Sequence, residues 1–109
     1  MAYSEALAER IRMILRSAKG VTERKMFGGI AFMLNGNMCC GVVDDELMLR
    51  LGPELASKAL KSPHTREMDF TGRVIKSMLY VEPAGIRATA SLAKWVGQAV
   101  DFASQLPPK

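Results

Sequence analysis

The dipeptide Asn35-Gly36, placed between two apolar runs, constrains the fold of this chain more than any other feature of its sequence. Residues 30–34 and 38–43 are almost entirely apolar and have lengths typical of strands. Asn-Gly favours a two-residue turn in which both central residues have positive φ. The sequence therefore predicts an antiparallel hairpin, in which Phe32 pairs with Cys39.

A second tight turn is predicted at Asp44-Asp45, and together the two turns sort the side chains of three strands into two faces. The face expected to lie under the helices is wholly apolar: Ala31, Met33, Met38, Cys40, Val42, Leu47, Leu49 and Leu51. The opposite face is expected to carry Ile30, Phe32, Leu34, Val43 and Met48 beside Asn37, Cys39, Glu46 and Arg50. So much apolar area on a second face indicates either a surface that a partner or a second copy covers, or one over which a later element packs, or a choice of strong β formers for sheet propensity alone.

Helices are predicted wherever apolar residues recur at helical spacing. The first helix is expected to begin at Ser4, as N-cap, and to end near Gly20, the second to span 52–61, and the third to run from Thr89 or Ser91 to Ser104. Further strands are predicted over 21–27, 66–70 and 74–81. In the last strand Ile75, Leu79 and Val81 are expected to face the core and Tyr80 the open side. The order α-β-β-β-β-α-β-β-α is typical of a two-layer α+β fold, an antiparallel sheet with helices packed on one face. Residues 1–109 are expected to form a single domain.

Composition and charge narrow the classes of function. The net charge of +4 and the pI of about 9.3 permit acidic partners without demonstrating them, because the basic residues are spread along the chain. No apolar stretch is long enough to span a bilayer and no signal peptide is recognisable, so we expect a cytoplasmic location and no membrane partner. Cys39 and Cys40 are adjacent within a strand, where their side chains point to opposite faces, so we expect reduced thiols rather than a disulfide. The single histidine, His64, lies in another segment and does not complete a metal site with them. No metal or other cofactor is expected.

Five parts of the chain share a recognisable pattern: residues 24–32, 34–38, 47–51 and 68–73, and the helix that carries Leu92 and Trp95. Together they resemble the N-terminal domain of the TfoX/Sxy regulators of bacterial competence. The most specific part is Met26-Phe27-Gly28-Gly29, and the likeness covers nearly the whole chain. It implies a two-layer α+β fold, of the kind grouped with secretion chaperones, with no known catalytic residues. The competence regulators carry a second, helical domain, so this chain is expected to be a stand-alone domain with a regulatory, binding-type character.

Three hypotheses of function follow. The first is a non-enzymatic regulatory or adaptor domain that binds a protein, or a second copy of itself, through Ile30, Phe32, Leu34, Cys39, Met48 and Arg50. The second is electrostatic DNA binding in transcription through Arg24, Lys25, Arg50, Arg73 and Lys76. The third is a small-ligand or redox-sensing domain, in which Arg50 opposite Cys39 lowers the pKa of that thiol.

Overall fold

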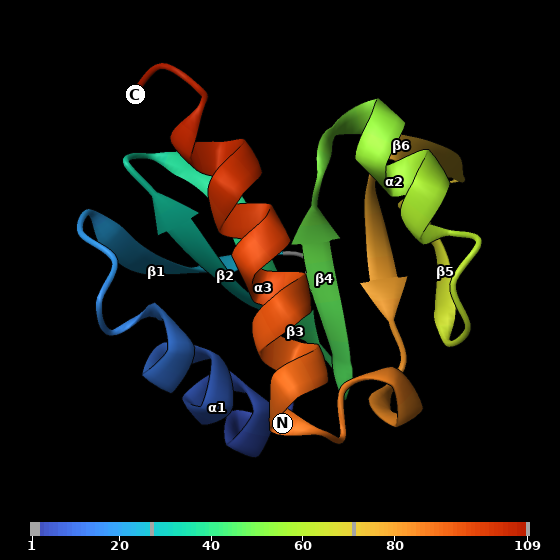
Figure 1. Ribbon diagram of the computed structural model, residues 1–109, viewed down its shortest axis with the longest axis horizontal. Helices are drawn as coiled ribbons and strands as arrows, with labels where there is room; N and C mark the ends of the chain where they lie inside the picture. Colours follow the sequence, from blue (N-terminus) through green and yellow to red (C-terminus); the bar gives the residue numbers. More distant parts are fainter. Residues whose placement is uncertain (1–2, 27, 71, 109) are drawn as a thin grey trace.

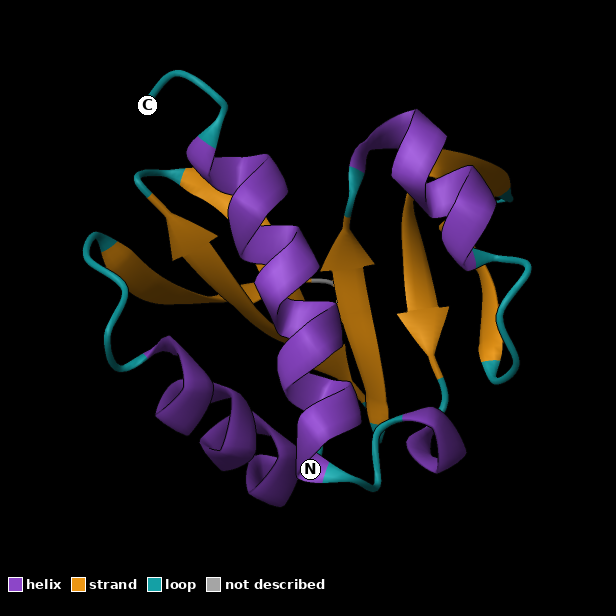
Figure 2. Cartoon of the chain, in the orientation of Figure 1, coloured by secondary structure: helices purple, strands orange, loops and turns teal. Residues whose placement is uncertain are grey.

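The computed structural model describes residues 3–26, 28–70 and 72–108. The elements in chain order are α1 (Glu5–Leu15), β1 (Val21–Met26), β2 (Gly29–Leu34), β3 (Asn37–Val43), β4 (Glu46–Arg50), α2 (Gly52–Ala59), β5 (Thr65–Phe70), β6 (Arg73–Val81), η1 (Pro83–Gly85) and α3 (Thr89–Ser104). Figure 2 shows these helices and strands along the chain. The predicted order of helices and strands and the α+β class are confirmed.

The six strands form one antiparallel sheet in the order β1-β2-β3-β4-β6-β5. Helices α1, α2 and α3 lie in front of the same face of this sheet (Figure 1). Helix α2 packs on β6, whereas α3 packs on β3 and β4 and also contacts α1. The main hydrophobic core lies between the helices and this face.

Local sequence signals set the turns and the helix ends. The N–H of Leu7 donates to the Ser4 hydroxyl at 3.2 Å, so Ser4 is the N-cap of α1 as predicted. Asn35 and Gly36 have φ values of 53° and 83°, which confirms a hairpin turn with two left-handed residues.

The predicted register of the first hairpin is wrong beyond the pairs nearest the turn. Met33 pairs with Met38 as predicted, but Phe32 pairs with Cys40 instead of Cys39. The extra residue, Cys39, makes a β-bulge in β3. Because side chains alternate along a strand, a shift of one residue turns every side chain of the partner strand to the other face.

The bulge therefore corrects the predicted faces of β2. Ile30, Phe32 and Leu34 lie under the helices in the main core, and Ala31 and Met33 belong to the opposite face. In the main core lie Cys39, Cys40 and Val42 of β3, Leu47 and Leu49 of β4, and Leu51, which follows β4. Met38 and Met48 belong to the opposite face. The predicted faces are thus right for β4 and reversed for β2. In β3 they are wrong for Met38 and Cys39, and also for Asn37, which pairs with the core residue Leu34 and is buried.

A second irregularity bends the pair β5–β6. Glu67 pairs with Leu79, but the next residue, Met68, pairs with Ile75, so residues 76–78 are inserted between consecutive pairs. Leu79 and Val81 lie in the main core as predicted, whereas Ile75 packs on the opposite face, contrary to the prediction.

Candidate functional site

The sheet face away from the helices carries a second apolar cluster, here called the methionine face. Its buried members are Ala31, Met48, Met68, Met78 and Tyr80, with Met33, Met38, Val43 and Ile75 half-buried at its margin. Five of the eight methionines of the chain are therefore in this cluster. Methionine is flexible and polarizable, and it is used at surfaces that adapt to different partners. No helix of the described residues covers this face (Figure 1).

One row of paired residues crosses the whole methionine face. From edge to edge of the sheet it reads Arg24, Ala31, Gly41, Met48, Tyr80 and Arg66. Since neighbouring strands lie about 4.8 Å apart, six strands span roughly 24 Å before curvature is considered. The row is basic at both ends and apolar between them, but Ala31, Met48 and Tyr80 are themselves buried, so a partner on this face would contact mainly its half-buried margin and the flanking charges.

The Arg66 end of this row is held by two neighbours. The Arg66 Nε atom donates to a Glu46 carboxylate oxygen at 2.9 Å, and its guanidinium carbon lies 4.4 Å from the centre of the Tyr80 ring. The Glu46 carboxylate raises the pKa of Arg66, and burial raises the pKa of the Tyr80 hydroxyl above its ordinary value. At the other end of the row, Arg24 on the edge strand β1 is exposed.

The predicted partner-binding residues do not form one exposed surface. Ile30, Phe32, Leu34 and Cys39 are buried under the helices, and the physical reason is the bulge described above. Met48 does lie on the methionine face, although its side chain is fully buried there. The Arg50 guanidinium carbon lies 5.7 Å from the centre of the Phe102 ring, at the end of α3.

The structure does not gather the predicted nucleic-acid residues on one surface. Arg24 and Lys25 are neighbours in β1 and therefore point to opposite faces of the sheet. Lys76 is exposed on β6, on the far side of the sheet from β1. The side chain of Arg73 lies outside the described residues.

The cysteine arrangement does not support redox sensing. Cys39 and Cys40 are free thiols, and both are buried. A hydrogen bond with Cys39, together with burial, holds the pKa of Cys40 well above its ordinary value, which favours the thiol over the nucleophilic thiolate. The expected neighbour of Cys39, Arg50, is not its strand partner. In the part of the chain that the structure describes, no three His, Cys, Asp or Glu side chains form a metal-binding group.

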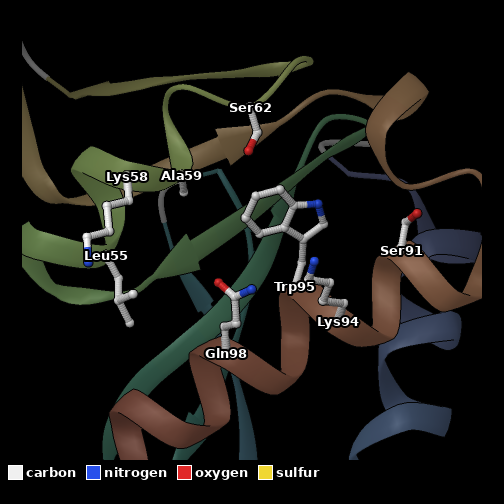
Figure 3. A pocket seen from close by; sticks show the side chains of 8 residues that line it. All are labelled: Leu55, Lys58, Ala59, Ser62, Ser91, Lys94, Trp95 and Gln98. Carbon is white, nitrogen blue, oxygen red and sulfur yellow. The ribbon is translucent and has the colours of Figure 1, made fainter.

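Sequence reasoning missed a furrow between α2 and α3, here called the α2–α3 furrow. Its cavity has a volume of about 380 Å³, and Figure 3 shows the indole of Trp95 between the two helices. The lining residues are Leu55, Lys58, Ala59, Ser62, Ser91, Lys94, Trp95 and Gln98. The available signal was the helical spacing of Ser91, Trp95 and Gln98, which places all three on one side of α3.

Six antiparallel strands with three helices on a single face define a small two-layer α+β domain. Residues 13–103 match the family described as the TfoX N-terminal domain. The chain belongs to this family, which is not known as a family of enzymes.

Comparison with curated proteins found no match, and comparison with solved structures found none either. Among the described residues, no helix has both the length and the apolar character needed to cross a membrane.

Proposed function

We propose that this chain is a cytoplasmic, non-enzymatic regulatory domain of the competence-regulator type, which binds an acidic protein through the methionine face. The observation that carries the proposal is the row that runs from Arg24 through Ala31, Met48 and Tyr80 to Arg66. Membership of the TfoX N-terminal family supports a regulatory role.

The apolar part of the contact is modest. Only the half-buried members of the methionine face, such as Met33, Met38 and Val43, have side-chain area left for a partner to cover. Each 100 Å² of apolar surface covered contributes about 2.5 kcal/mol before the cost of association. Because only this margin can be covered, we expect a reversible regulatory contact rather than a permanent assembly.

The charges of the face favour an acidic partner over a second copy of the chain. Arg24 stands exposed at one end and Arg66, whose charge is partly neutralised by Glu46, stands at the other, and the whole chain carries a net charge of +4. Two such faces meeting each other would bring like charges to the margin of the contact, which costs free energy. Acidic groups at the margin of a partner would instead raise the rate of association and fix its orientation.

Site-specific photo-crosslinking in cells tests the proposal. A photoreactive amino acid is placed at Met33 on the methionine face and, as a matched control, at Met13, which is 59% exposed on α1. We expect a discrete adduct with an acidic protein from position 33 only, and we expect Arg24→Glu to abolish it. Equal adducts from both positions, no adduct from position 33, or an adduct of twice the chain mass would overturn the proposal.

A further inference from the structure

The α2–α3 furrow exists because its two helices pack over different strands. Helix α2 lies on β6 and α3 lies on β3 and β4, so the helices do not close on each other along their facing sides. Residues Leu55 and Ala59 of α2 and Trp95 of α3 line the gap between them. This furrow is on the helix side of the sheet and therefore does not depend on the methionine face.

The furrow combines an apolar floor with basic sides. Trp95 is half-buried against the main core, and Leu55 is one of the few large apolar side chains that are strongly exposed, at 42%. Lys58 of α2 and Lys94 of α3 are the charged residues among the described ones that line it, and both carry positive charge. Ser62, Ser91 and Gln98 add groups that can donate or accept hydrogen bonds.

The furrow continues past Leu55 towards the end of α3. A second hollow of about 430 Å³ shares Leu55 and is lined also by Leu51, Gly52, Pro53, Glu54 and Phe102. From Ser91 to Phe102 the helix rises about 16 Å, which is the length of three helical turns of a bound peptide. Charge varies along this length, because Lys58 and Lys94 flank the Trp95 end and Glu54 and Arg50 lie at the Phe102 end.

We propose that the α2–α3 furrow binds an acidic, amphipathic segment of a partner protein. The segment lays an apolar residue against Trp95 and Leu55 and places its carboxylates beside Lys58 and Lys94. This is helix-in-groove recognition, in which apolar side chains at helical spacing supply affinity and the charges select the partner.

The test uses three synthetic 14-residue peptides with blocked ends. The first has Leu at positions i, i+4 and i+7 with Glu and Ala elsewhere, the second replaces each Glu with Lys, and the third replaces each Leu with Ser. Trp95 is the only tryptophan of the chain, so its fluorescence reports on this furrow alone. We expect only the first peptide to change the Trp95 emission saturably, and to shift the backbone amide resonances of residues 55–62 and 91–98.

Two double variants with the same change of net charge separate the furrow from the rest of the surface. Lys58→Glu with Lys94→Glu is expected to weaken binding of the first peptide at least tenfold. Arg16→Glu with Lys19→Glu, on exposed residues outside the furrow, is expected to change it less than twofold. Because neither control residue belongs to the furrow or to the methionine face, failure of this proposal and failure of the proposed function are distinguishable.

Three results would overturn the furrow proposal. The first is equal binding of the Glu and Lys peptides, and the second is equal loss of affinity in the two double variants. The third is that a single-stranded oligonucleotide binds while the acidic peptide leaves the Trp95 emission unchanged. Lys58, Lys94 and Trp95 would then form a nucleic-acid site, with the lysines beside phosphates and the indole stacked on a base.

Discussion

The terminal methyl group of Met48 lies directly over Gly41 in the neighbouring strand. A Cβ atom added to Gly41 would stand 2.7 Å from Met48 Cε, and it would also meet the backbone carbonyl oxygen of Ile30. The two residues are strand partners at the centre of the row that crosses the methionine face. The absence of a side chain at Gly41 therefore lets Met48 lie flat against the sheet.

Gly41→Ala is expected to destabilise the fold by about 1–3 kcal/mol, the usual cost of overpacking a buried site. One of the crowded atoms belongs to the Ile30 backbone and cannot move without disturbing the sheet. Gly97→Ala is the matched control, because a Cβ there meets nothing within 4 Å and alanine favours the helix by about 0.5–1 kcal/mol. Urea denaturation measures both variants, and a neutral Gly41→Ala would contradict the packing described.

Phe32 and Met33 test which face of β2 lies under the helices. Phe32 is only 1% exposed within the main core, so Phe32→Ala is expected to cost about 3–5 kcal/mol of unfolding free energy. Met33→Ala, on the half-buried margin of the opposite face, is expected to cost less than half as much. The reverse order of the two losses in chemical denaturation would show that β2 has the opposite orientation.

Arg12 joins α1 to β1 through three carboxylates. Its guanidinium lies 2.8 Å from Glu5, 3.1 Å from Glu9 and 2.8 Å from Glu23. The hydrogen bond from Arg12 holds the pKa of Glu5 below its ordinary value of 4.5. This contribution to stability is therefore complete above pH 4.5 and is lost as the pH falls through the lowered value.

Arg12→Met is accordingly expected to lower the unfolding free energy at pH 7, with the difference from the parent chain shrinking as the pH falls below about 4.5. The control is Arg16→Met, since Arg16 forms no ion pair within the described part of the chain. Thermal unfolding at several pH values checks the pair. A difference for Arg12→Met that stays constant from pH 7 to pH 3 would contradict the ion network.

Elements that depend on local signals were predictable, and features that depend on packing between elements were not. The Asn35-Gly36 turn and the Ser4 cap follow from side-chain chemistry within a few residues. The bulge at Cys39 does not, because the position of an extra residue is decided by how the sheet curves under the helices. Glycine within a strand, as at Gly41, was the one local signal of an irregularity nearby.

The candidate site shows the same division. Alternation along β6 correctly placed Tyr80 on the open side, opposite Leu79 and Val81. One misplaced residue in β3 then reversed the predicted faces of β2, and with them most of the proposed contact residues. The α2–α3 furrow could not be predicted, because helical spacing identifies the apolar side of α3 but not the strands that each helix covers.

The most direct test of the central claim is the affinity of the protein captured at position 33, measured by titration calorimetry with the purified components. Binding through the methionine face predicts that Met33→Asp and Arg24→Glu each weaken the complex at least tenfold, while Met13→Asp on α1 leaves it unchanged. Affinities that are equal for the parent chain and all three variants would contradict the claim that this face binds the partner.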